Sequence, residues 1–288
     1  MKKYLIVLTL AALLPAFSLA ACKKHDSTEA EPPELESPLP GTGGGIFDIP
    51  NFLPEVPPKN TEKNENEAPM PETPVPKTAS YVLVKTNGLN VRSGAGTGYA
   101  ALGQVEKGVL LPLSEREGNW YRTEYRGKTA YVSAEQKYTE LFTLECGEDS
   151  VEKVIAEGSK LLGTPYVYGA VRYLDGKGNL LKGFTNEKFD CSSLMQYIFY
   201  RGAGIVLDVT TRTQIVQGTH VQRSDIQRGD LLFFTNASRK NLSGIERVGH
   251  VALYLGGNYI LHTSSDYAKI EQISSTRWSY FIEARRMF

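Results

Sequence analysis

Proline is distributed so unevenly along this chain of 288 residues that it decides how much of the chain can fold. Twelve of the fifteen prolines lie between Lys23 and Lys77, among many Glu, Asn and Thr residues. Such a segment buries too little apolar surface to offset the entropy that it loses on ordering. We therefore expect a disordered tether over residues 22–79 and a globular part that starts near residue 80.

Residues 1–21 precede this tether and have the pattern of a secretory signal peptide. Two lysines, an apolar run from Tyr4 and small residues stand before Cys22. The segment Leu19-Ala20-Ala21-Cys22 resembles the bacterial lipoprotein box, which implies cleavage before Cys22 and lipid on that cysteine. The alternative is an ordinary signal peptide with an incidental cysteine. We expect a lipid-anchored protein of the cell envelope that faces the periplasm or the cell wall.

Composition excludes several other classes of protein. The formal net charge is zero, so bulk charge gives no argument for a nucleic-acid partner. Three cysteines are too few for a disulfide scaffold, and none of them forms a short metal-binding spacing with a histidine. We expect no metal and no cofactor, and a protein that works as a monomer.

Residues 80–142 consist of short β-rich pieces separated by glycine turns, a pattern typical of a small all-β barrel. The stretch "LNVRSGAGTGYAALGQVEKG", followed by "NWYRTEYRGKTAYV", resembles the bacterial SH3 domain. That resemblance implies an SH3-like module that binds wall peptides or shapes a neighbouring enzyme site. Trp120 is expected in the barrel core rather than in direct contact with a ligand.

Residues 146–288 change from helical to strand patterns along the chain. An apolar stripe follows Ser150, and "FDCSSLMQYIFY" at 189–200 repeats apolar residues four apart, with Gly202 as the expected helix stop. The runs at 229–234, 249–264 and 279–288 have strand patterns. Helices followed by strands predict an α+β domain with helices packed on a mainly antiparallel sheet.

Cys191 stands in the first turn of the second predicted helix. Backbone N–H groups and the helix dipole at that position favour a thiolate over a thiol. Two other interpretations remain open: a buried, inert cysteine, and a disulfide between Cys146 and Cys191.

Two histidines are expected on one face of a hairpin. In "VGHVALYLGGNYILHTS" a loop of Gly256-Gly257-Asn258 would place Leu255 opposite Tyr259. His250 and His262 then become diagonal neighbours within hydrogen-bonding reach, although a slip of one residue would separate them. A cysteine at a helix start and two histidines on one sheet face indicate a nucleophile, a base and an orienting group.

At this point the sequence becomes similar to a known family. The segments "FDCSS", "RGDLLFF", "VGHVALYLG", "HTSS" and "ARRMF", in this order, resemble the NlpC/P60 family of papain-like cell-wall cysteine peptidases. The resemblance implies Cys191 as nucleophile, His250 as general base and His262 as the third polar residue. It further implies that Tyr166 lies near the oxyanion site.

The resemblance also implies a substrate. Family members of the γ-D-glutamyl–diamino acid type cut stem peptides of peptidoglycan, and Asp190 and Ser192 match positions that hold the substrate's amino end. Thr211 and Gln214 are expected in the same pocket. A free N-terminal L-Ala is expected to pair with Asp190, with a nearby barrel wall that leaves no room for attached sugar. Alternatives are an amidase or acyltransferase on the same fold and a non-enzymatic wall-binding lipoprotein.

The sequence departs from the family pattern around the nucleophile. Tyr168, Ala170 and Ser193 replace a tryptophan and two glycines, which affects pocket shape rather than a reacting group. Residues 171–188 and 235–247 form long stretches before the cysteine and before the histidine strand. We expect them to be rim loops that set specificity, with neutral surface insertions as the alternative.

Overall fold

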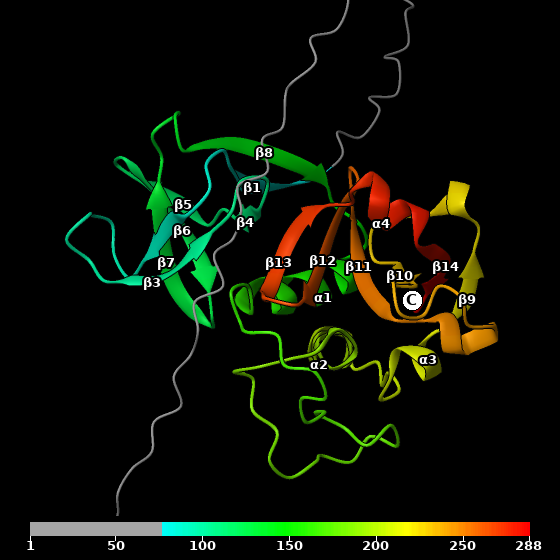
Figure 1. The fold of residues 1–288 in the computed structure, drawn as a ribbon. Helices are drawn as coiled ribbons and strands as arrows, with labels where there is room; N and C mark the ends of the chain where they lie inside the picture. The colour runs from blue at the N-terminus through cyan, green and yellow to red at the C-terminus, as the bar shows by residue number, and fades with distance from the viewer. Residues whose placement is uncertain (1–76) are drawn as a thin grey trace, which may run out of the picture. The chain divides into compact units, whose positions relative to one another are not determined.

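The computed structural model describes residues 77–288 (Figure 1). The predicted signal peptide, the tether and the lipidation at Cys22 lie outside these residues. The described residues belong to one unit, and they include no helix that is both long and apolar enough to cross a membrane.

Eight short strands form the first part of this unit. They are β1 (Thr78–Val84), β2 (Leu89–Arg92), β3 (Ala101–Val105), β4 (Leu110–Pro112), β5 (Glu115–Glu117), β6 (Trp120–Tyr125), β7 (Lys128–Ser133) and β8 (Thr139–Glu145). Strands β3-β2-β7-β6-β5 pair in that order, and β1 pairs with β8 and β4. In β6, Tyr121, Thr123 and Tyr125 are buried and alternate with more exposed neighbours, as a strand with one face on a core requires. Trp120 is only half-buried, so its expected place in the barrel core is wrong.

The second part carries the helices and six further strands. Its elements are α1 (Asp149–Lys160), α2 (Cys191–Ala203), α3 (Thr211–Gln214), β9 (Thr219–Val221), η1 (Arg223–Asp225), β10 (Leu231–Phe234), η2 (Gly244–Arg247), β11 (His250–Gly256), β12 (Tyr259–Ser264), β13 (Tyr267–Gln272), α4 (Ser275–Ser279) and β14 (Phe281–Arg286). Every pairing between these strands is antiparallel, in the order β13-β12-β11-β10-β14-β9. The predicted α+β class, with helices on an antiparallel sheet, is confirmed.

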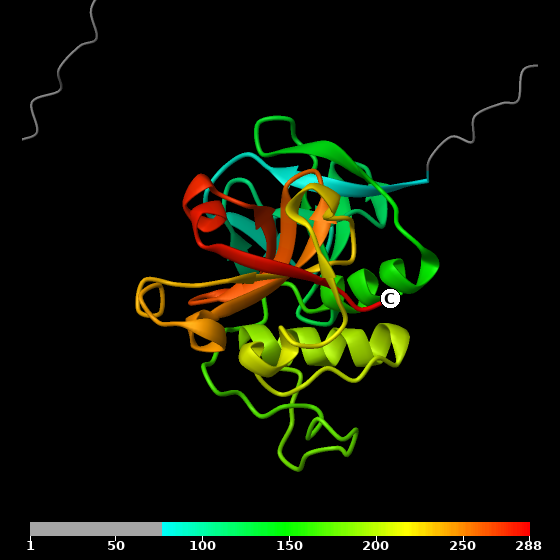
Figure 2. The same ribbon diagram turned by 90° about the vertical axis from the view of Figure 1, so that its right-hand side faces the viewer.

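Helices α1 and α2 lie side by side on one face of this sheet (Figure 2). The apolar residues predicted to share a face of α2 are fully buried against it: Leu194, Met195, Ile198 and Phe199. The helix runs past Gly202 and ends at Gly204, whose φ of 71° is the left-handed conformation that glycine adopts without strain. Gly202 instead permits close packing, because a Cβ there would lie 2.5 Å from the Cα of Val154 in α1.

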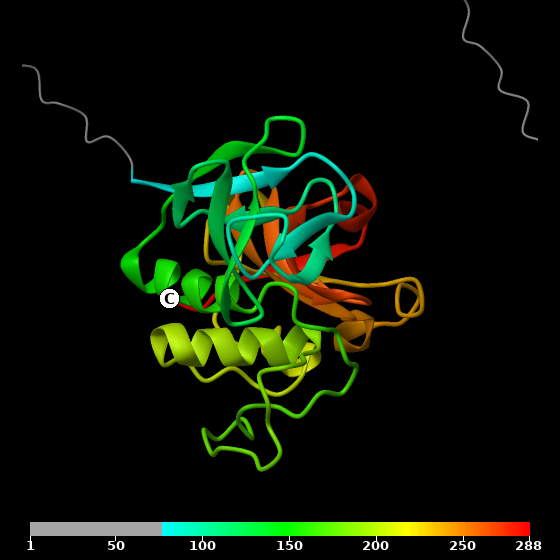
Figure 3. The ribbon, with the colours of Figure 1, turned by 90° about the vertical axis from the view of Figure 1, so that its left-hand side faces the viewer.

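The barrel and the helical part share a sheet. Strand β4 pairs with β13 at Leu110 and Ile270, which extends the sheet to β8-β1-β4-β13-β12-β11-β10-β14-β9 (Figure 3). Arg228 also links the two parts. Its guanidinium donates to Glu152 of α1 and to the Leu255 carbonyl of β11 in the second part, and to the Tyr81 hydroxyl of β1 in the first.

Residues 163–190 form a long irregular segment, of which the first residues pair with β13 and the later part lies on the side of α2 that faces away from the sheet (Figure 2). Tyr173 and Phe184 of this segment pack their rings against Tyr197, with centroids 5.2 and 5.3 Å away. Such aromatic contacts bury large apolar surfaces and so fix a segment that has little regular backbone pairing. The segment ends at Asp190, directly before α2.

Candidate active site

The start of α2 holds Cys191 in a fixed position. Asp190 is the N-cap: its carboxylate accepts from the Ser193 backbone N–H, and the Ser193 hydroxyl is 2.9 Å from the Asp190 backbone N–H. This reciprocal capping box satisfies orphan donors at the helix start. Cys191 is therefore the first helical residue, as predicted, and its side chain is buried among core residues.

The predicted register of the histidine hairpin is confirmed, although by a different turn. Leu253 pairs with Leu261 and Tyr254 with Ile260, but Gly256 then pairs with Tyr259, so Leu255 is a bulge. The turn proper is Gly257-Asn258, with φ values of 55° and 68°. Both residues thus have the positive φ that a two-residue hairpin turn needs.

This register brings the two histidine rings into contact. His250 Nε2 lies 3.1 Å from His262 Nδ1, and the rings meet edge-on at 82°. His262 Nε2 lies 2.9 Å from the Glu271 carboxylate on β13. A carboxylate can only accept, so His262 donates from Nε2 and accepts at Nδ1, and His250 donates from Nε2. The unprotonated nitrogen of His250 is therefore Nδ1.

Glu271 was not found from the sequence, because strand β13 was not predicted. Its carboxylate lies 3.5 Å from both Lys269 Nζ and Arg277 Nη2. Burial raises the pKa of Glu271, but the His262 hydrogen bond and the two cations outweigh it and lower the pKa to about 2. Glu271 is therefore an anion at neutral pH.

Two pockets meet at Cys191. One, here called the histidine pocket, has a volume of about 350 Å³ and includes His250 and Arg277. The other, here called the arginine pocket, has a volume of about 450 Å³ and includes Arg172, Arg212 and Arg239. Residues common to both pockets are Tyr166, Cys191, Asn236 and Gly249. Of the predicted site residues, Asp190, Ser192 and Thr211 line the arginine pocket.

Burial sets the protonation of the reacting groups. It raises the pKa of the Cys191 thiol to about 11, with the Asp190 charge acting in the same direction, against the backbone N–H groups of Val251 and Ser192. Burial also holds the pKa of His250 well below its usual value, and His262 and Arg277 lower it further. A neutral thiol and a neutral imidazole follow, in place of the thiolate that the helix start alone favours.

The Asp190 carboxylate is saturated, which the sequence did not reveal. It accepts from the Gly169 N–H, the Ser192 hydroxyl and the Ser193 N–H. It also forms an ion pair of 2.8 Å with Arg172, whose side chain is 18 % exposed. A carboxylate has about four acceptor positions, so this arrangement leaves none for the substrate amine assigned to Asp190.

Gln214 does not line the arginine pocket in the way that the sequence suggested. It is fully buried, and its amide donates to the backbone carbonyls of Ser192 and Asp208. It therefore supports α2 and the loop before α3 rather than contacting a ligand. Thr211, by contrast, is the first residue of α3 and does line the pocket.

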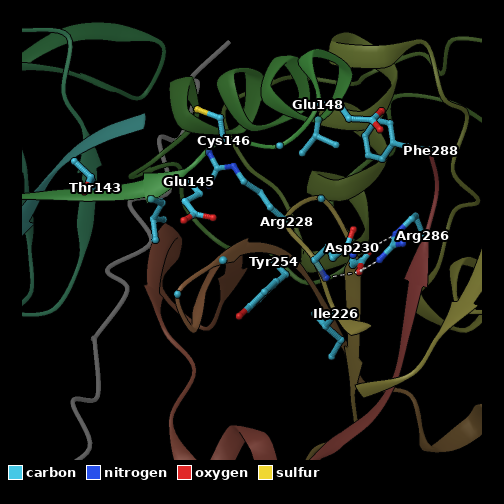
Figure 4. Close-up of a pocket in the computed structure, with 17 residues that line it drawn as sticks. Thr143, Glu145, Cys146, Glu148, Ile226, Arg228, Asp230, Tyr254, Arg286 and Phe288 are labelled. Carbon is cyan, nitrogen blue, oxygen red and sulfur yellow. Dashed lines mark hydrogen bonds and ion pairs between the residues drawn. The ribbon is translucent and has the colours of Figure 1, made fainter. Parts of the chain in front are cut away.

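A third cavity, of about 780 Å³, lies where β8, α1 and the β10–β11 strands meet (Figure 4). Cys146 borders it and is free, as is Cys191, so the alternative of a disulfide between them is wrong. Three of the charged groups labelled there are engaged in ion pairs: Arg228 binds Glu152, and Asp230 binds Arg286. Among residues 77–288 no group of three His, Cys, Asp or Glu side chains is placed to hold a metal.

Comparisons with known proteins agree with the two-part architecture. Residues 163–286 match the model of the NlpC/P60 family, and residues 87–139 match that of the bacterial SH3 domain. Among curated proteins, the γ-DL-glutamyl hydrolase of Bacillus subtilis is 26% identical over 67% of this chain and 40% of its own length. The peptidoglycan endopeptidase RipA of Mycolicibacterium smegmatis is 30% identical over 47% of this chain and 26% of its own.

A third relative is the γ-D-glutamyl-L-lysine dipeptidyl-peptidase of Bacillus subtilis, which is 26% identical over 60% of this chain and 50% of its own length. The chain thus spans half or less of the length of each of these relatives. The part of the chain that carries Cys191, His250 and His262 matches the NlpC/P60 model, and the part before it matches the bacterial SH3 model.

Proposed function

We propose that this protein is a cysteine peptidase that hydrolyses stem peptides of peptidoglycan at the γ-D-glutamyl–diamino acid bond, in cell-wall turnover or recycling. One observation carries the proposal: Cys191 and His250 line one pocket, and His250 is linked through His262 to the Glu271 carboxylate. The names of the three relatives, a glutamyl hydrolase, a peptidoglycan endopeptidase and a glutamyl-lysine dipeptidyl-peptidase, support this substrate class.

The proposed reaction starts from the neutral pair. His250 Nδ1 takes the proton of Cys191 as the sulfur attacks the carbonyl carbon of the scissile amide. Negative charge then develops on the carbonyl oxygen, where N–H groups at the start of α2 and the Tyr166 hydroxyl are donors. Burial, with the charge of Asp190, raises the pKa of Tyr166, so this side chain stays a donor at neutral pH.

The second half of the reaction returns the proton. The tetrahedral intermediate collapses, the C–N bond breaks, and the His250 imidazolium protonates the leaving amine. Water, deprotonated by His250, then attacks the thioester and releases the glutamyl carboxylate and the free Cys191 thiol. The positive charge that His250 carries between these steps is stabilised through His262 by Glu271.

The location of the enzyme is part of the proposal. Peptidoglycan lies outside the cytoplasmic membrane, and lipid on Cys22 would tether the catalytic unit to a membrane within reach of the wall. The SH3-like barrel would bind wall peptides or support the catalytic part.

A product assay tests the function. Full-length protein is incubated with purified muropeptides, and mass spectrometry identifies new termini. We expect a free diamino-acid amine and a D-glutamate γ-carboxylate, and no such products with Cys191→Ala. Loss of the sugar-linked L-Ala bond instead would indicate an amidase, transfer to an added amine would indicate an acyltransferase, and intact muropeptides would favour a wall-binding protein.

A further inference from the structure

Two irregular segments each deliver an arginine to the arginine pocket. Arg172 comes from the stretch 171–188 before α2, and Arg239 comes from the stretch 235–247 before β11. Arg212, on α3, is the third. Three arginines from three separate parts of the chain therefore line this pocket.

Arg172 removes the pocket's only lining carboxylate from ligand binding. Its Nη1 forms the ion pair with Asp190, its Nη2 is 3.1 Å from the Ser192 hydroxyl, and its Nε donates to the Val209 carbonyl. Asp190 is left with no free acceptor position, and its negative charge is paired with the positive charge of Arg172. A charged amine in this pocket would find no anion to replace the water that it loses.

The other two arginines leave an excess of positive charge. Arg212 and Arg239 share a single carboxylate, Glu246, at 3.6 Å and 3.3 Å. Their side chains are 32% and 26% exposed, so both are partly shielded from solvent and still accessible to a ligand. Two guanidinium groups against one carboxylate give a net charge that attracts an anion, and arginine matches the planar geometry of a carboxylate.

The barrel does not close the pocket. Every residue that lines it lies between Tyr166 and Gly249, whereas the barrel strands end at Glu145. The expected barrel wall beside the substrate's amino end is therefore wrong for this pocket. A substituent on the L-Ala nitrogen would not meet the barrel there.

The pocket also lies on the acyl side of the bond. His250, which gives its proton to the leaving amine, lines the histidine pocket, so the opposite pocket receives the acyl part. A D-glutamate linked through its γ-carboxyl keeps a free α-carboxylate, at most roughly 6 Å from the carbonyl carbon across four carbon–carbon bonds.

We infer that the arginine pocket binds this free α-carboxylate through Arg212 and Arg239, and that the enzyme does not require a free amine on L-Ala. This inference deepens the proposed function and rests on it for the identity of the substrate. The enzyme then selects its substrates by the negative charge of this α-carboxylate. It prefers stems with D-glutamate over stems in which the α-carboxylate is amidated to give D-isoglutamine.

The test uses substrates that differ in one group. L-Ala-γ-D-Glu-diamino acid is compared with its D-isoglutamine counterpart, and each is used with a free or an acetylated N-terminus. We expect kcat/KM to be tenfold to a hundredfold higher for the carboxylate than for the amide, since a hydrogen bond to a charged group contributes about that factor. Acetylation should change kcat/KM by less than about threefold, well below the factor expected for losing such a bond.

Variants identify the residues. The double variant Arg212→Gln and Arg239→Gln should lose activity on the carboxylate substrate and keep it on the amide, so that the preference disappears. Arg116→Gln, which removes an exposed arginine of the barrel strand β5, is the matched control and should keep the preference.

Binding to Cys191→Ala by calorimetry separates this inference from the proposed function. Tighter binding of the carboxylate tripeptide would support the inference even if the wild type hydrolysed neither substrate, an outcome that would overturn the proposed function alone. Equal binding and equal cleavage of both peptides would overturn the inference alone. Cleavage that depends on a free N-terminus would also overturn it.

Discussion

Glu271 offers the sharpest test of how this site works. Its negative charge acts on His250, the proposed general base, across the intervening ring of His262. Its Oε1 lies 2.9 Å from His262 Nε2, and the two histidine centroids are 5.1 Å apart. The carboxylate therefore lies roughly 9 Å from the His250 ring, which at an effective dielectric constant of about 20 gives about 2 kcal/mol of stabilisation for an imidazolium.

Glu271→Gln removes this charge but keeps an acceptor for His262. We expect kcat/KM to fall about twentyfold, the rate equivalent of about 2 kcal/mol. Arg277 and Lys269, left without their shared anion, act in the same direction. Glu271→Ala also removes the acceptor that selects the His262 tautomer, and a further loss of about tenfold is expected.

The pH profile separates electrostatics from simple damage. A nearby anion raises the pKa of His250, so its removal must lower that pKa further below its usual value. The acidic limb of kcat/KM, which reports His250 in the free enzyme, should then move to lower pH by about one unit while the plateau falls. A general loss of folded protein would lower the plateau without moving the limb.

The control is a second carboxylate–histidine pair with the same distance between the oxygen and nitrogen atoms. Glu283 lies 2.9 Å from His220 Nδ1, on β14 and β9. Glu283→Gln should leave kcat/KM and the acidic limb unchanged. A Glu271→Gln variant with wild-type kcat/KM and an unshifted limb would refute the argument that charge passes through His262.

Three further predictions concern stability and location. Gly202→Ala should destabilise the fold by about 2 kcal/mol, seen as a lower Tm, because its Cβ would lie 2.5 Å from Val154 Cα; an unchanged Tm would mean that the helices can separate. Arg228→Met should cost about 2 kcal/mol or more by leaving Glu152 unpaired, and the double variant with Glu152→Met should recover part of it in chemical denaturation. Cys22→Ser should move the protein from the membrane pellet to the soluble fraction with its activity intact, and persistence in the pellet would contradict lipidation.

The sequence could predict those parts of the site that depend on local pairing. Gly257 and Asn258 specify a tight turn, and a tight turn fixes the register of the two strands, so the contact between His250 and His262 followed without knowledge of the fold. The bulge at Leu255 compensated for a turn that is one residue shorter than expected, which left the register intact.

The parts that could not be predicted depend on tertiary contacts. Glu271 reaches His262 from a neighbouring strand that follows an Asp266 turn, and no local pattern marks that pairing. Arg172 reaches Asp190 only because rings such as Tyr173 hold an irregular segment on α2. The protonation of Cys191 also reversed the local expectation, since burial by the whole domain outweighed the helix start.

The shared sheet has a consequence for the way that this protein can be divided. A catalytic part cut free of its barrel would present β13 as an edge strand, with backbone N–H and C=O groups near Ile270 open to other chains. It would also leave Arg228 without its hydrogen bond to the Tyr81 hydroxyl. The barrel thus covers the edge of the catalytic sheet and protects it from aggregation. Because the two parts share a sheet, they should unfold in one cooperative thermal transition rather than as separate modules.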